Sequence, residues 1–218
     1  MTTKAILLST IILFSLISCN LKDSFKQEET LLLKKLDFDS ELISELKEFK
    51  KGEIKQLPAI DQETGDCLIN DFFNGIYFET VEKNADVFLL NMKPKFKEKG
   101  YLIFLFRSDD NKANIAVIKG HDELDILRYR RTDAMNYNLE SKDIVKKVSE
   151  WKAKYGVTII GCGINWLHII FDKLPRDMDA FSKDVYSFCP DSVDQGTGSI
   201  EELKKAIIEM NGVWLWWD

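Results

Sequence analysis

The densest run of polar, chemistry-bearing residues is CPDSVDQGTGS, which spans 189–199. Asp191 and Asp194 offer carboxylates for a cation or for acid–base chemistry, and Cys189 offers a thiol nucleophile. The glycines allow close backbone approach, and the run ends at a predicted helix N-terminus, where free N–H groups favour an anion. The competing interpretation is a structured loop between two helices, held by Asp and Thr side chains that bond their own backbone.

The last residues, WLWWD, add aromatic rings and a carboxylate. In a strand, Trp214 and Trp216 face one way and Trp217 the other. Such rings can stack a ligand, although a strand apolar on both faces is more often core. The terminal Asp218 places a second carboxylate beside that of the chain end. We therefore take the candidate binding surface to comprise Asn136, Tyr137, Asp191, Asp194, Gln195, Gly196, Trp216 and Asp218.

Familiar catalytic and cofactor motifs are missing from the sequence. It has no HExxH, CxxC, GxSxG or Walker loop, so we expect no metal and no cofactor. The run Gly161-Cys162-Gly163 begins like a dinucleotide fingerprint, but Trp166 stands where the third glycine belongs. We interpret it as a tight turn or bulge. His168, in an alternating strand, is expected to be half-buried with its hydrogen bonds satisfied.

The N-terminal residues have the pattern of an export signal. Lys4 is followed by an uncharged, almost wholly apolar run over 5–18, too short to span a bilayer comfortably. The run ends in LISC, which resembles the bacterial lipobox. We expect a signal peptide over 1–18, lipid on Cys19, a tether over 19–38 and a membrane-anchored lipoprotein of the bacterial cell envelope, on its periplasmic or cell-surface face. The competing interpretation is an ordinary signal or a buried apolar segment in which Cys19 is incidental.

Composition indicates one globular domain over 39–218. The chain has 218 residues, 45% of them hydrophobic and 30% charged, with a formal net charge of −6. This acidic balance argues against nucleic-acid binding, which needs a basic face to meet phosphates. Besides Cys19 there are three cysteines, which allow one disulfide. Cys162 and Cys189 are the best pair because both lie in the C-terminal half; three free thiols are the alternative.

Hydrophobic periodicity predicts alternating strands and helices, and hence an α/β fold, with α+β as the alternative, in which several helices pack on a mixed sheet. Helices are predicted from Asp39 or Ser40 to Gly52, and over 84–100 with a kink at Pro94, 141–156, 177–188 and 199–211. Strands are predicted over 75–81, 101–106, 114–119, 124–130, 157–161, 167–172 and 213–217. The strands 114–119 and 124–130 would form a hairpin, and 53–74 would be irregular.

Several C-terminal pieces together resemble the bacterial domain-of-unknown-function family 4253. They are TDAMNYNL at 132–139, WKAKYG at 151–156, LP at 174–175, VYSFCPD at 185–191, DQGTG at 194–198 and LWWD at 215–218. The resemblance covers about 75–218 and is densest from Leu124 onward, although the chain has fewer glycines over 132–138 than the family pattern. It implies a C-terminal α/β domain and supplies no activity or catalytic residues.

The leading functional hypothesis is a binding or interaction lipoprotein without catalytic activity. Its partners would be the membrane, through lipid on Cys19, and an envelope or extracellular protein or a small ligand. One alternative is a metal-assisted hydrolase or transferase that uses Asp191, Asp194 and Asp218. Others are a toxin-neutralising immunity-type protein and a structural envelope component without a pocket. The spatial relation of the three carboxylates discriminates between the binding and the enzyme hypotheses.

Overall fold

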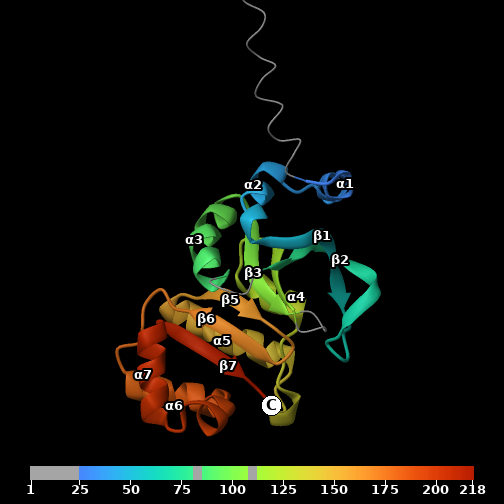
Figure 1. Ribbon diagram of the computed structural model, residues 1–218. Helices are drawn as coiled ribbons and strands as arrows, with labels where there is room; N and C mark the ends of the chain where they lie inside the picture. The colour runs from blue at the N-terminus through green and yellow to red at the C-terminus, as the bar shows by residue number, and fades with distance from the viewer. Residues whose placement is uncertain (1–24, 81–84, 108–111) are drawn as a thin grey trace, which may run out of the picture. The chain divides into compact units, whose positions relative to one another are not determined.

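The structure is a computed structural model that describes residues 25–80, 85–107 and 112–218 (Figure 1). The predicted signal peptide and Cys19 lie outside these residues. The described chain divides into two compact units, one that ends at Glu48 and one over Phe49–Asp218. The second unit contains every candidate site residue of the folded domain.

The first unit contains two short helices. Helix α1 spans Gln27–Lys35, within the segment expected to be a tether, and α2 spans Ser40–Ser44. The Asp39 carboxylate caps α2 by accepting from the backbone N–H groups of Glu41 and Leu42, both at 3.0 Å. The helix predicted to reach Gly52 is thus much shorter, and a 3-10 turn, η1 at Lys47–Phe49, follows it. No helix among residues 25–80, 85–107 and 112–218 has the length and apolar character needed to cross a membrane.

The second unit is built on a seven-stranded mixed sheet of order β1-β2-β4-β3-β5-β6-β7. Neighbouring strands are antiparallel except β3 and β5, which are parallel. This architecture confirms the predicted α/β class with a mixed sheet. The strands are β1 (Lys50–Ile60), β2 (Cys67–Thr80), β3 (Tyr101–Arg107), β4 (Ala113–Lys119), β5 (Thr158–Cys162), β6 (Trp166–Ile170) and β7 (Gly212–Trp216).

Helices cover the sheet because alternate strand residues are apolar on both faces. One buried cluster joins Phe104 and Leu167 of the strands to Trp151 of α5. Residues between the cluster members, such as Ile103, point to the opposite face, and α3 packs on β3. The helices of this unit are α3 (Ala85–Glu98), α4 (Leu124–Arg130), α5 (Ser141–Tyr155), α6 (Met178–Phe188) and α7 (Ile200–Met210), with a 3-10 turn η2 (Met135–Tyr137) and a π-helical turn η3 (Ser192–Thr197).

Two sequence-based predictions of secondary structure are wrong. Residues 53–74, expected to be irregular, form most of a long β1–β2 hairpin whose register shifts at three places. Pro58 removes a backbone donor, which only an edge strand tolerates, and β1 is an edge strand. Residues 124–130, expected to form a strand, are helix α4; the Asp122 carboxylate accepts from the backbone N–H of Leu124 at 3.1 Å and starts the helix.

Strand direction brings several chain segments together at one end of the strands, which differs from the edge strands of the sheet. Strands β3, β5 and β7 run the same way, because β3 is parallel to β5 and β6 reverses direction between β5 and β7. Their carboxyl ends, at Arg107, Cys162 and Trp216, therefore meet at this end, where the chain also terminates (Figure 1). In open α/β sheets, ligands commonly bind outside the carboxyl ends of such strands.

Candidate functional site

The predicted binding surface forms a hydrogen-bonded network around Asp191. This carboxylate is only 3% exposed. Its Oδ1 accepts from the Tyr137 hydroxyl at 2.6 Å and the Gln195 Nε2 at 3.0 Å, and its Oδ2 accepts from the backbone N–H of Asp218 at 2.9 Å. The side-chain amide of Asn136 donates to the backbone carbonyl of Asp218. Asp191 thus joins η2, η3 and the chain end, which is a positioning role.

The hydrogen bond to Asp191 changes the chemistry of Tyr137. It is the largest cause that raises the pKa of the Tyr137 phenol to about 12, because losing the proton would place two anions side by side. Tyr186 donates to Asp194 Oδ1 at 3.2 Å, which also raises the pKa of that phenol. Both tyrosines therefore stay neutral donors near neutral pH.

The structure does not assemble the predicted carboxylate cluster. The carboxylate of Asp191 is buried and already accepts three hydrogen bonds. Asp194, in contrast, is exposed and accepts from Tyr186. No group of three or more His, Cys, Asp or Glu side chains in the described part of the chain could hold a metal ion. Convergence of Asp191, Asp194 and Asp218 was the geometric condition for the hydrolase hypothesis, and these residues do not meet it.

The possible disulfide between Cys162 and Cys189 is not formed in the structure, where Cys67, Cys162 and Cys189 are all free thiols, as in the alternative. Cys162 and Cys189 are both buried in the core. The Cys189 thiol donates to the carbonyl of Trp216 at 2.9 Å, and burial raises its pKa to about 11. Burial likewise raises the pKa of Cys162 to about 12. A protonated, buried thiol is a poor nucleophile, so Cys189 is a core residue.

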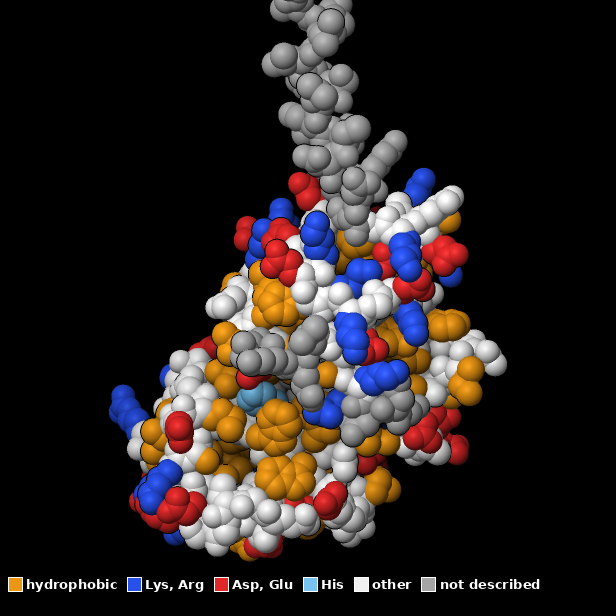
Figure 2. Space-filling view, viewed as in Figure 1, with side chains coloured by type: hydrophobic (Ala, Val, Ile, Leu, Met, Phe, Trp, Pro, Cys, Tyr) orange, Lys and Arg blue, Asp and Glu red, His pale blue; other side chains and the backbone are white. Residues whose placement is uncertain are grey.

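A cavity of about 620 Å³ lies where β3, β5 and β7 end. We call it the tryptophan groove. Its volume is typical of small-molecule sites, which span about 300–1,000 Å³. It is lined by Asp66, Arg107, Arg130, Gly163, Ile164, Asn165, Trp166, Trp214, Trp216 and Asp218. Figure 2 shows hydrophobic side chains gathered over β6 and β7, with a histidine ring among them. Of the predicted binding residues, Trp216 and Asp218 line this groove.

Glycines make room for two of the groove's indole rings. A side chain at Gly163 would collide with the indole nitrogen of Trp166, and a Cβ at Gly161 would lie 3.0 Å from that ring and 2.7 Å from Leu105. A Cβ at Gly196 would lie 2.6 Å from the ring of Trp216. The β5–β6 pairing also shifts register between Ile159 and Gly161, which confirms the predicted bulge. The glycines thus let the rings lie close against the backbone.

The indoles of Trp166 and Trp214 stack on each other. Their ring centroids are 5.4 Å apart and their planes differ by 8°. Trp214 remains 39% exposed although it is large and apolar. A smaller cavity of about 200 Å³ adjoins the same pair of rings and is also lined by Asp86 and Arg107. Exposed aromatic surface within a cavity is available for a ligand ring.

Arg130, at the end of α4, lines the groove as a buried cation. The residue is 3% exposed, and its Nη1 donates to the carbonyl of Gly65 at 2.7 Å. Its guanidinium carbon lies 5.8 Å from the ring centre of Phe106. Its Nε–H has no acceptor, and none of the described carboxylates forms an ion pair with it. Burial raises the pKa of the Asp133 carboxyl, and Arg130 is close enough to oppose that shift, although the two form no direct ion pair. A buried cation without a direct ion pair is costly, so this arrangement is unusual for a purely structural residue.

His168 departs from its prediction. It is 7% exposed, and the described residues offer a hydrogen bond to neither ring nitrogen. The ring lies 4.9 Å from that of Trp214, and burial lowers its pKa to about 4. The expectation of a satisfied histidine is therefore wrong. Strand alternation places its side chain on the same sheet face as Trp166, where apolar neighbours replace hydrogen-bond partners.

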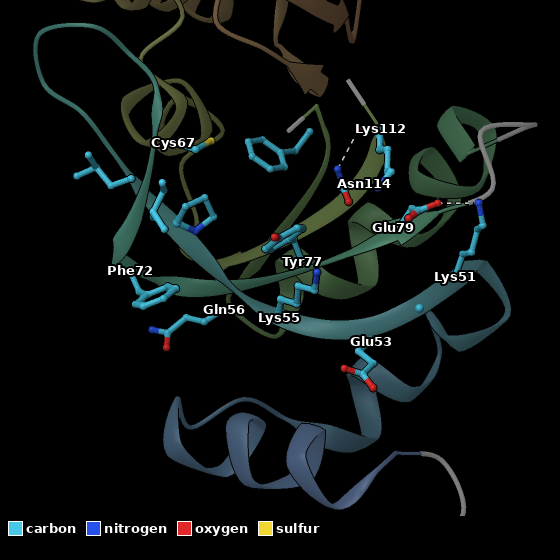
Figure 3. Close-up of a pocket in the computed structure, with 15 residues that line it drawn as sticks. Lys51, Glu53, Lys55, Gln56, Cys67, Phe72, Tyr77, Glu79, Lys112 and Asn114 are labelled. Carbon is cyan, nitrogen blue, oxygen red and sulfur yellow. Dashed lines mark hydrogen bonds and ion pairs between the residues drawn. The ribbon is translucent and has the colours of Figure 1, made fainter. Parts of the chain in front are cut away.

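A second cavity, of about 380 Å³, lies along the β1–β2 hairpin (Figure 3). Lys51, Glu53 and Lys55 of β1 and Tyr77 and Glu79 of β2 contribute to its lining. Lys51 forms an ion pair with Glu79 at 2.7 Å. The outer half of β2 adds exposed apolar side chains, with Ile69 at 87% and Phe72 at 53% exposure. This surface combines lysines with uncovered apolar side chains. It was not predicted from the sequence, because residues 53–74 were expected to be irregular.

The comparisons with known proteins identify one family. Residues 114–218 match the model of the family described as Domain of unknown function (DUF4253). The match begins at residue 114, whereas the resemblance in the sequence extended to about residue 75. No curated protein and no solved structure matches the chain significantly. The matched residues contain Arg130, the three groove tryptophans and Asp191. The C-terminal part of this chain, residues 114–218, is therefore similar to the DUF4253 family.

Proposed function

We propose that this chain is a lipid-anchored binding protein of the bacterial cell envelope, and that its folded domain binds a small ligand in the tryptophan groove. One observation carries the proposal: an accessible cavity of ligand size is lined by stacked indoles and by two arginines. Stacking rings and a few fixed polar groups are the usual composition of a small-molecule site. The groove's place at the carboxyl ends of three strands agrees with this use, by analogy with other open sheets.

The anchoring part of the proposal rests on the charge and hydropathy of residues 1–19. Cleavage before Cys19 and acylation of its thiol would attach the folded domain to a membrane. Replacing Cys19 by Ala should abolish incorporation of a labelled fatty acid and leave an unprocessed chain of higher mass. Processing and labelling that persist in Cys19→Ala would refute the anchor.

Ligand binding is tested on the groove itself. Trp214→Ala removes an exposed ring that no other side chain covers fully, so the fold should tolerate it. Indole derivatives, titrated into the full chain by calorimetry, should bind the native protein and lose about tenfold or more in affinity with Trp214→Ala, which corresponds to a stacking contribution of about 1–3 kcal/mol. Leu31, an apolar residue 59% exposed in the other unit, provides the control variant Leu31→Ala. Equal affinity in all three proteins would count against the groove.

A second candidate function, recognition of a protein partner, is favoured by the β1–β2 surface. Ile69 and Phe72 are exposed beside Lys51 and Lys55, and large uncovered apolar side chains mark protein-binding surfaces more often than chance. A toxin-neutralising immunity-type protein is one version of this candidate. A photo-crosslinking residue at position 69 should capture one specific envelope or extracellular protein in cells, whereas the same residue at the exposed Lys142 should not. Identical adducts from both positions would refute it.

A further inference from the structure

We infer that Arg130 is an anion-recognition residue, and that the groove's ligand couples a ring to a carboxylate or phosphate group. This inference rests on the proposed binding function and specifies the ligand's chemistry. Arg130 is 97% buried by its neighbours, and its Nε–H lacks an acceptor among the described residues. A guanidinium presents donors in a planar fork that matches the oxygens of carboxylates and phosphates.

The immediate surroundings of Arg130 hold it in place without neutralising it. Its Nη1 is fixed on the carbonyl of Gly65, and its flat face lies over Phe106. A carbonyl and a ring compensate a buried cation only in part, since neither carries a full negative charge. Because the side chain is already oriented, an incoming oxyanion would lose little of its binding energy in ordering the arginine.

The neighbouring residue, Arg131, shows what a structural arginine looks like at this place. It follows Arg130 in the chain and also binds the loop between β1 and β2. There it donates to the Gln62 side chain at 2.6 Å and to the Gln62 carbonyl at 2.8 Å. Arg131 does not line the tryptophan groove. Both residues are therefore arginines that bind the loop between β1 and β2, but only Arg130 lines the cavity. This difference makes Arg131 a matched control.

The aromatic surface determines the other half of the ligand. Trp166 and Trp214 present nearly parallel, stacked rings in the cavity that Arg130 lines. Flat or partly apolar rings stack on such surfaces, and an anionic substituent would then reach the arginine. Asp66 and Asp218 line the same cavity and are exposed, so they add acceptors for ligand hydroxyl groups. Aromatic carboxylates and acidic sugars both have this chemistry.

Two pairs of probes separate the contributions of ring and charge. Indole-3-acetate and indole-3-acetamide share a ring and differ in charge, as do glucuronate and glucuronamide. Calorimetry on the full chain should give about tenfold tighter binding for the acid in at least one pair, because a hydrogen bond to a charged group exceeds one to a neutral group. The pair that shows the preference identifies the source of the ring.

Variants assign the preference to Arg130. Arg130→Met should bring the acid-to-amide ratio close to one, whereas Arg131→Met should retain it; Arg130→Lys, which keeps the charge, should retain part of it if the Met variant folds poorly. Equal binding of acid and amide by the native chain, with Trp214→Ala still weakening both, would overturn the anion inference and leave the groove's function standing. Failure of all four probes to bind would refute both. Loss of the preference in Arg131→Met as well would also overturn the assignment.

Discussion

Replacing Asp191 by Ala tests whether the predicted binding surface is really a structural junction. The native carboxylate is 3% exposed and accepts hydrogen bonds from Tyr137, Gln195 and the backbone of Asp218. These donors come from three separate segments of the chain. Alanine removes the acceptor from all of them at once, so the chain end and η3 lose their shared anchor.

The expected loss in the free energy of unfolding depends on which of the three donors can form a hydrogen bond with water once the carboxylate is removed. Each hydrogen bond to a charged group contributes about 1.5–3 kcal/mol, but the three contributions do not add fully. Gln195 is exposed and Tyr137 half-buried, so water can replace much of what they lose. We therefore expect the free energy of unfolding to fall by about 3 kcal/mol. In a chain of this size that lowers Tm by roughly 6–12 °C.

Urea unfolding followed by tryptophan fluorescence measures this change, with Asp194→Ala as the control. Asp194 lies three residues further along the same turn, is exposed and accepts from Tyr186 at 3.2 Å. Its removal should change the free energy of unfolding by about 0.5 kcal/mol or less. If Asp191→Ala and Asp194→Ala destabilise the chain equally, the reasoning from burial and donor count is refuted.

Titration of Tyr137 provides an independent readout of the same junction. Its pKa is raised from 10.0 to about 12, chiefly by the hydrogen bond to Asp191. A raised folded-state pKa contributes stability that is complete below pH 10 and is lost as the pH rises from 10 through 12. In Asp191→Ala the phenol's ultraviolet titration should move back towards pH 10. An unchanged midpoint would mean that the hydrogen bond does not form in solution.

Three further predictions concern the buried groups around the sheet. The pKa of His168 is lowered from 6.5 to about 4, so the folded state favours the neutral ring. The free energy of unfolding should therefore fall by about 3 kcal/mol as the pH falls from 6.5 to 4. His168→Phe should remove this part of the acid sensitivity, as measured by urea titrations at several pH values. Gly163→Ala should displace the Trp166 ring, destabilise the chain by about 1–3 kcal/mol and change the indole signal in near-ultraviolet circular dichroism. Lys93 and Glu123, buried 3.4 Å apart, form an ion pair; Glu123→Ala should cost about 3–5 kcal/mol by thermal unfolding, and adding Lys93→Met should restore part of it.

Local pattern was enough to predict most helices and strands. The helical spacing of Ile144, Val148 and Trp151 predicted α5, and the unbroken apolar run at 101–106 predicted the central strand β3. Local pattern failed at 124–130, because a segment of seven residues is too short for the spacing of its apolar residues to distinguish a helix from a strand. It also failed at 53–74, where Pro58 and several polar residues are typical of a loop although the segment forms part of an edge strand.

For the candidate site too, some residues were predicted from the sequence, whereas their roles depend on the tertiary structure. The sequence identified Asp191, Tyr137, Gln195 and Asp218 as a group, and the structure brings them into one network. Their role as a junction was not predictable, because burial of the carboxylate depends on segments up to 54 residues apart in the chain. The role of Arg130 was not predictable for a similar reason: in the sequence it is one of several charged residues, and only packing buries it without a direct ion pair.

Composition, periodicity and short motifs were sufficient to predict the α/β class and the similarity of the C-terminal half to a known family. They also predict an export-type N-terminus, which lies outside the described residues and stays a prediction. Only strand order and packing show that Cys162 and Cys189 are not bonded to each other, that Asp191, Asp194 and Asp218 form no metal-binding group, and that tryptophans of β6 and β7 share a cavity with Arg130. The physical reason is that strand order and direction place residues distant in the chain side by side. A ligand groove or a buried charge is a property of that placement, which no local pattern specifies.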